Sequence, residues 1–123
     1  VYFYKIGKEM GIDYIHDVMS YFGFGKSTGS LIQGEKSGLL PSTAWKKRVK
    51  GESWYTGETL IASIGQGFML STPLQLAQAT AIMVNGGKNY KPTILLDEKS
   101  ELLGEIDIPV EYTEIAKKLL IQR

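Results

Sequence analysis

Residues 60–87 form a stretch without any charged side chain: LIASIGQGFMLSTPLQLAQATAIMVNGG. A bilayer-spanning helix needs roughly 20 consecutive, predominantly apolar residues, and here glycine, proline, glutamine, serine and threonine interrupt the apolar run. The whole chain, at 43% hydrophobic and 22% charged residues, has the composition of a soluble globular protein. The sequence therefore predicts that this segment is buried within a folded protein.

The second half of this stretch carries a strong helix signal. Thr72 can cap a helix, Pro73 suits its first position, and Gln75 completes a capping box. Asn85 and the two glycines after it predict the end of the helix. The helix is apolar nearly all round, which predicts burial on several sides. One face carries Leu74, Ala77, Ala81 and Val84, and another carries Leu76, Ala79 and Met83.

Two other segments have apolar residues at helical spacing. The first, residues 12–22, has Asp13 in its first turn and Gly23 directly after its last apolar position, both of which favour a helix. His16, the only histidine of the chain, falls within it, and we interpret it as a surface or partly hydrogen-bonded helix position rather than a catalytic residue. The second, residues 110–121, places Tyr112, Ile115, Ala116 and Leu119 on one face.

Residues 90–96 should form a short extended segment.

Residues 23–57 are rich in glycine, serine and lysine and predict a long loop. Its expected anchors on the body of the protein are Leu39, Leu40, Trp45, Trp54 and Tyr55. The loop also contains a basic run, made of Lys46, Lys47, Arg48 and Lys50. No aromatic residues interleave with these cations, and the net charge is only +1. We therefore interpret the run as a solvated loop rather than a nucleic-acid site.

Two short segments match known functional sequence motifs. Gly25-Lys26-Ser27 matches the end of a phosphate-binding loop. However, Ser20 occupies the position where that loop needs its first glycine, and a helix precedes the motif where the loop needs a strand. We therefore predict that the motif is a turn. Lys36-Ser37-Gly38 matches one signature of penicillin-recognising serine enzymes, but its neighbours lack the alternation of a strand.

The chain contains neither Ser-x-x-Lys nor Ser-x-Asn or Ser-x-Asp, so it has no activated serine for acyl transfer. The absence of cysteine and the single histidine also argue against a zinc site or a Ser-His-Asp triad within the chain.

Ser63-Ile64-Gly65-Gln66-Gly67 is a third motif. Two glycines around one polar residue let the backbone pass close to another group. That group is either a ligand or the helix that begins at Thr72, and spacing alone favours packing.

Residues 54–87 resemble the transpeptidase domain of class B penicillin-binding proteins. Residues 22–46, FGFGKSTGSLIQGEKSGLLPSTAWK, resemble more narrowly the elongation-type penicillin-binding protein 2. In that family a glycine-rich loop leads to an acidic residue, a Gly-x-x-Pro and a Trp-Lys. The matching residues here are Glu35, Gly38, Pro41, Trp45 and Lys46. The resemblance covers residues 1–96, and the tail from Asp97 is similar to the variable insert ahead of the family's last signature.

This resemblance implies a mainly α fragment of the α+β penicillin-binding transpeptidase (serine β-lactamase-like) fold, in which helices flank an antiparallel sheet. It implies that the second signature, Ser-x-Asn or Ser-x-Asp, precedes Val1, and that the third, Lys-Thr-Gly or Lys-Ser-Gly, follows Arg123. Residues 1–123 are then expected to be a partial domain, truncated at both ends and without the catalytic motifs. We expect such a chain to be inactive by itself.

For the whole protein the resemblance implies peptidoglycan D,D-transpeptidation. A serine attacks the D-Ala-D-Ala end of a stem peptide, a lysine acts as general base, and an acyl-enzyme forms, which β-lactams also produce. The resemblance implies no metal and no organic cofactor. It places Ile64, Gly65, Gln66 and Gly67 in the wall of the substrate cleft. Trp54, Tyr55 and Thr59 are expected to be scaffold, and Tyr2 to support the helix of the second signature.

The expected partners are the peptidoglycan stem peptide, β-lactam antibiotics and membrane proteins of the elongation machinery. The expected location is the periplasmic or extracytoplasmic face of the bacterial cell membrane, with an N-terminal anchor absent from this chain. Exposed apolar surface would let the fragment self-associate. The alternative function is a non-catalytic module that binds cell-wall peptide.

Overall fold

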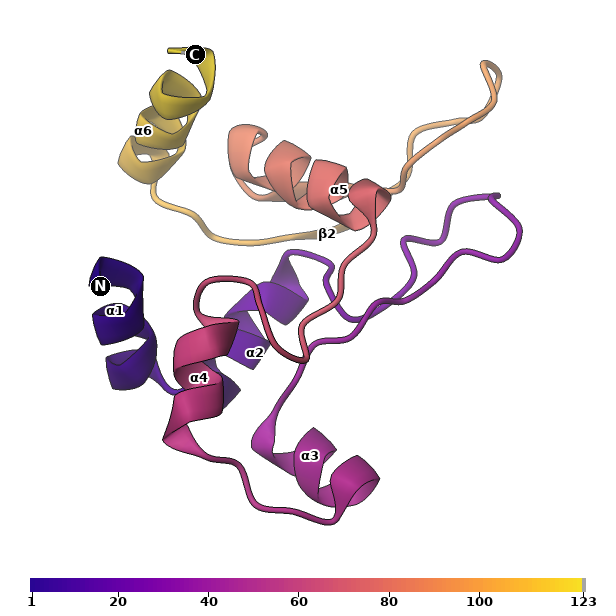
Figure 1. The fold of residues 1–123 in the computed structure, drawn as a ribbon. Coiled ribbons are helices and arrows are strands. Elements are labelled where there is room, and N and C mark those ends of the chain that lie inside the picture. The colour runs from indigo at the N-terminus through magenta and orange to yellow at the C-terminus, as the bar shows by residue number, and fades with distance from the viewer. Residues whose placement is uncertain (123) are drawn as a thin grey trace.

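The computed structural model of the protein describes residues 1–122. Helices dominate this part, and a small two-stranded sheet comes between the last two of them along the chain (Figure 1). Within these residues we find no helix with the length and hydropathy of a membrane span. In chain order the elements are α1 (Tyr2–Met10), α2 (Ile12–Tyr21), α3 (Thr43–Lys50), α4 (Thr56–Ala62), α5 (Pro73–Val84), β1 (Lys88–Tyr90), β2 (Leu102–Glu105) and α6 (Val110–Ile121).

Helix α2 is the helix predicted over residues 12–22. Asp13 lies in its first turn, and Gly23 follows its last turn with a φ of 90°. The Nδ1 atom of His16 lies 3.1 Å from the carbonyl oxygen of Leu40 and 3.2 Å from that of Pro41. The histidine therefore ties α2 to the segment before α3, which confirms that it is a hydrogen-bonded helix position.

Helix α3 corrects the prediction that residues 23–57 form one loop. Ser42 caps this helix by accepting a hydrogen bond of 3.0 Å from the backbone N–H of Trp45. Gly51, with a φ of 71°, ends it in the left-handed conformation. The basic run thus lies on a helix, and the interpretation of a solvated loop is wrong for Lys46, which is only 2% exposed.

The expected loop anchors are confirmed except for one. Leu40 is buried, whereas the Tyr55 side chain is 62% exposed and holds its position through the backbone instead. The half-buried anchors are Leu39, Trp45 and Trp54.

Polar side chains hold the loop that joins α2 to α3. Glu35 accepts hydrogen bonds from the backbone N–H of Thr28, at 2.8 Å, and from its hydroxyl. Gln75 of α5 is fully buried and donates from Nε2 to the carbonyl oxygens of Lys26, at 2.8 Å, and Ser37, at 2.7 Å. One amide group therefore joins the two ends of the segment 26–37. The beginning of this loop is a turn after a helix, as predicted.

Helix α5 begins and ends where the sequence predicts. The backbone N–H of Thr72 donates to Gln75 Oε1 at 2.9 Å, and the backbone N–H of Gln75 donates to Thr72 Oγ1 at 3.1 Å. The prediction of apolar burial on several sides is wrong, because the buried residues are Gln75, Gln78 and Ile82. Glutamines occupy this inner face because they hydrogen-bond to other segments, while Leu76 is 59% exposed and lines a groove described below.

Strands β1 and β2 pair in antiparallel fashion, with Lys88 opposite Glu105 and Tyr90 opposite Leu102. The prediction of an extended segment over residues 90–96 is misplaced, because the strand ends at Tyr90. Pro92 lacks the backbone N–H that a ladder requires, and a long hairpin loop begins there (Figure 1).

Helix α6 has the bounds predicted for it, but its buried residue is Thr113. The predicted apolar face is largely exposed, with Tyr112 at 59%, Ile115 at 54% and Leu119 at 65% of their surfaces. Helix α6 packs on α5 in the upper part of Figure 1, and its leucines reach the same groove as Leu76.

Candidate functional site

The predicted cleft-wall residues, Ile64 to Gly67, form a turn directly after α4. Gly65 and Gly67 have φ angles of 75° and 76°, which side chains other than glycine rarely adopt. A Cβ atom on Gly65 would meet no atom within 4 Å, so the expectation that this glycine allows close packing is wrong. A Cβ atom on Gly67 would lie 3.2 Å from Cγ2 of Ile61, in the last turn of α4. Backbone conformation, rather than contact with α5, explains Gly65.

The turn presents both an apolar and a polar side chain. Ile64 is 41% exposed, and Gln66 is also exposed. An aliphatic group beside a primary amide can contact the side chain of a peptide and hydrogen-bond its backbone. Whether these residues bind a ligand stays a prediction.

Helix α4, which carries this turn, is fixed at its start by a buried ion pair. The Nζ atom of Lys46 lies 2.6 Å and 2.8 Å from the two carboxylate oxygens of Glu58, and 4.6 Å from the centre of the Tyr55 ring. Burial lowers the pKa of Lys46, but the hydrogen bond and charge of Glu58, helped by Glu52, outweigh burial and leave this pKa above its ordinary value. Burial likewise raises the pKa of Glu58, and the hydrogen bonds from Lys46 and the Tyr55 backbone outweigh it, so the pKa is lowered.

Aromatic side chains support the same helix from the loop before it. Trp54 Nε1 donates to Thr59 Oγ1 at 2.8 Å. The Phe68 ring, just beyond the turn, lies between Trp45, at 5.2 Å, and Trp54, at 6.4 Å between ring centres. The scaffold role predicted for Trp54 and Thr59 is confirmed by these contacts.

Helix α1 packs against α4 and runs in the opposite direction (Figure 1). Gly7, which is buried, packs directly against Ser63. Since Ser63 immediately precedes the turn, the turn lies toward the N-terminal half of α1. Tyr2 at that end is 70% exposed and makes an edge-on contact with Phe3.

The motif Lys36-Ser37-Gly38 lies in irregular structure, as predicted, and not on a strand edge. Gly38 has a φ of 63°, and a Cβ atom there would lie 2.3 Å from the carbonyl oxygen of Leu70. The glycine therefore serves a close backbone contact, next to the bridge between Leu39 and Leu70.

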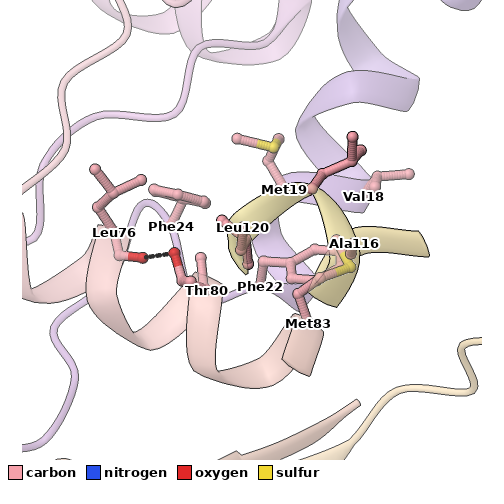
Figure 2. Close-up of a pocket in the computed structure, with 11 residues that line it drawn as sticks. Val18, Met19, Phe22, Phe24, Leu76, Thr80, Met83, Ala116 and Leu120 are labelled. Atoms are coloured by element: carbon pink, nitrogen blue, oxygen red, sulfur yellow. Dashed lines mark hydrogen bonds between the residues drawn. The ribbon is translucent and has the colours of Figure 1, made fainter. Parts of the chain in front are cut away.

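An apolar groove of about 570 Å³ opens between α2, α5 and α6 (Figure 2). The hydroxyl group among its lining side chains belongs to Thr80, and it donates to the Leu76 carbonyl oxygen at 2.9 Å. A binding site for a polar ligand needs polar groups that fix its orientation, and this groove offers none. Its lining residues are Val18, Met19, Phe22, Phe24, Leu76, Ala79, Thr80, Met83, Ala116, Leu119 and Leu120.

Residues 1–122 contain no arrangement suited to covalent catalysis or metal binding. The hydroxyls of Ser20, Ser37 and Ser63 donate to backbone carbonyl oxygens. Ser30 Oγ lies 3.4 Å from Glu35 Oε2, and the same carboxylate already accepts two hydrogen bonds from Thr28. Over the same range no three His, Asp or Glu side chains gather as metal ligands. None of these serine hydroxyls is paired with a lysine or a histidine in the part of the chain that the structure describes.

Comparison with known proteins identifies the family. The model of the penicillin binding protein transpeptidase domain matches residues 1–123. The chain therefore belongs to the penicillin-binding protein transpeptidase family, and its mainly helical structure with a small antiparallel sheet confirms the predicted fold class. Within the family it is of the PBP2/MrdA type.

The peptidoglycan D,D-transpeptidase MrdA of Salmonella typhimurium is 46% identical over 99 residues, which are 80% of this chain and 16% of that protein. The structure of Pseudomonas aeruginosa PBP2 in complex with WCK 5153 matches 95% of this chain and 28% of its own, with a TM-score of 0.84 and 35% identity. Helicobacter pylori PBP2 in complex with MreC matches 96% of this chain and 22% of its own, with a TM-score of 0.81 and 32% identity. The chain thus spans less than a third of each of these relatives.

Proposed function

We propose that this chain is part of a peptidoglycan D,D-transpeptidase that cross-links stem peptides through a serine acyl-enzyme and is acylated by β-lactams. The family match over residues 1–123 is the observation that carries the proposal. In it, residues 1–123 are a partial transpeptidase domain that supplies scaffold and one wall of the cleft. The serine and lysine lie elsewhere in the protein, because these residues contain no Ser-x-x-Lys.

The proposed wall consists of Ile64, Gly65, Gln66 and Gly67. Two observations support this placement: the turn is exposed, and it lies toward the N-terminal half of α1. In the proposal the second signature precedes Val1, so the antiparallel packing of α1 and α4 brings the turn to the end of α1 nearest that signature. Gln66 would hydrogen-bond the backbone of the stem peptide, and Ile64 would contact one of its side chains.

We place the whole protein at the periplasmic face of the bacterial cell membrane, held by an anchor outside residues 1–123, with membrane proteins of the elongation machinery as partners. The complex of Helicobacter pylori PBP2 with MreC supports a protein partner. A further structural relative, 29% identical with a TM-score of 0.74, belongs to a peptidoglycan synthase complex. Both observations concern those relatives, and we extend them to this protein by proposal.

Labelling with a fluorescent penicillin tests the function. The full-length protein that carries this chain should be labelled on a serine outside residues 1–123, and the chain alone should stay unlabelled. If the full-length protein is not labelled, the transpeptidase proposal fails, and the non-catalytic peptide-binding module replaces it.

The wall residues are tested separately in the full-length protein. Gln66→Ala should lower the second-order acylation constant about fivefold, because one hydrogen bond is worth about 1 kcal/mol. Gln33→Ala, at an exposed position in the segment 26–37, is the matched control and should leave the constant unchanged. Normal labelling with equal constants for the two variants would contradict the wall placement while leaving the transpeptidase function standing.

A further inference from the structure

We propose that the contact between Gly7 and Ser63 sets the width of the substrate cleft, by fixing the distance between α1 and the wall turn, residues 64–67. The inference rests on the proposed function, in which the second signature adjoins the N-terminal end of α1. Gly7 is then a positioning residue, since it acts through the backbone of α1 and α4 and touches no substrate.

The separation between the two helices leaves no room for a side chain at position 7. A Cβ atom on Gly7 would lie 2.4 Å from Ser63 Cβ and 2.9 Å from Ser63 Oγ. Carbon atoms pack at about 3.5–4.0 Å, so an added methyl group would push the helices apart by about 1 Å. Ser63 cannot turn away, because its Cβ is attached to the backbone and its hydroxyl donates to the Leu60 carbonyl oxygen at 2.6 Å.

Backbone conformation does not explain a glycine at this position. Gly7 lies within α1 and is not among the glycines with positive φ. Glycine is less favourable than alanine inside a helix. Close approach of the two helices is therefore the physical reason for Gly7. Gly57, a glycine within α4, makes a useful contrast, since a Cβ atom there would meet nothing within 4 Å.

The position of Ser63 directs such a push to the wall turn. The start of α4 is held by the ion pair between Glu58 and Lys46, with a shortest distance of 2.6 Å. Ser63 stands at the opposite end of α4, one residue before Ile64. A displacement at Ser63 therefore moves the turn more than the anchored end, and a 1 Å misplacement at a catalytic site lowers a rate by up to about 100-fold.

The experiment uses the full-length protein and measures the acylation rate constant at saturating penicillin, the dissociation constant that precedes it, and the melting temperature. Gly7→Ala should lower the acylation rate constant at least about tenfold. Its melting temperature should not rise, although alanine favours the helix. Gly57→Ala, the matched control, should leave the rate constant and the dissociation constant unchanged.

Second substitutions at Ser63 identify the atom responsible. Gly7→Ala with Ser63→Gly should restore the acylation rate constant to that of Ser63→Gly alone, because the opposing Cβ atom is gone. Gly7→Ala with Ser63→Ala should stay slow, because the Cβ atom remains and only the hydroxyl is lost. This comparison holds even if Gly7→Ala folds poorly by itself, since the two double variants differ by one methyl group.

Two results would overturn the inference: a wild-type acylation rate in Gly7→Ala, or equal rates in the two double variants. If the wild-type protein is not acylated at all, the proposed function has failed, and the inference falls with it. A labelled wild type with an unaffected Gly7→Ala variant instead removes the inference alone.

Discussion

Replacing Gln75 with methionine should release the segment 26–37. The Gln75 side chain is fully buried. Its amide donates to the carbonyl oxygens of Lys26 and Ser37, at 2.8 Å and 2.7 Å, and accepts from the backbone N–H of Thr72 at 2.9 Å. Methionine has a similar unbranched shape, so the substitution removes these hydrogen bonds without opening a large cavity.

The expected cost follows from the number of hydrogen bonds lost. The bonds to Lys26 and Ser37 span the segment, so at about 1 kcal/mol for each their loss lowers the free energy of closing it by about 2 kcal/mol, while the bond from Thr72 belongs to the capping box of α5. Gln78 provides a matched control on the same buried face. Its Nε2 donates to Asn89 Oδ1 at 2.8 Å, and its Oε1 accepts no hydrogen bond within residues 1–122. Gln78→Met should therefore cost about 1 kcal/mol or less.

Hydrogen exchange, measured by mass spectrometry on the full-length protein, reports how often the segment 26–37 opens. Peptides covering residues 26–39 should exchange roughly 30-fold faster in Gln75→Met, since about 1.4 kcal/mol corresponds to tenfold. The same peptides should exchange less than about tenfold faster in Gln78→Met. Equal acceleration in the two variants, or none in Gln75→Met, would refute the reasoning that these hydrogen bonds close the segment.

Three further predictions concern the stability of the full-length protein. Lys46→Met should lower the melting temperature by several degrees, because it leaves a half-buried carboxylate on α4 unpaired, while Lys47→Met, at an exposed position, should not. Hydrogen bonds from the Thr28 hydroxyl and backbone N–H hold the pKa of Glu35 below its ordinary 4.5. The stabilisation is therefore complete above pH 4.5 and is lost as pH falls through the lowered pKa, so thermal melts of wild type and Glu35→Gln should differ at pH 7 and converge in acid. Gly38→Ala should lower the free energy of unfolding, measured by urea titration, by more than the about 1–2 kcal/mol of a left-handed alanine, because its Cβ would also meet a backbone oxygen. An unchanged urea midpoint would contradict the contact.

Local signals were sufficient to predict several element boundaries. The capping box at Thr72 and Gln75, and Gly23 after α2, act through neighbouring residues, so they can be read from the chain alone. Helix α3 carries equally local signals in Ser42 and Gly51. The basic residues between them conceal the apolar periodicity of the helix, and for this reason the sequence predicts a loop there.

Burial could not be predicted in the same way, because it depends on partners distant in sequence. Gln75 is buried through a hydrogen bond to Lys26, 49 residues away. Likewise, nothing near Gly7 in the sequence indicates that Ser63 will stand against it. The wall turn is predicted by the family resemblance, whereas spacing alone favours packing for Gly65, where the structure leaves open space.

Because Gln75 and Glu35 close the segment 26–37, its tip is a suitable site for inserting a labelling peptide. Leu31, Ile32 and Gln33 are exposed and lie beyond these ties. Extra chain inserted there adds little entropy cost, about 0.6 kcal/mol for each doubling of loop length. An epitope or a dye-labelling peptide placed between Ile32 and Gln33 would therefore follow the protein in living cells while the helices beneath keep their arrangement.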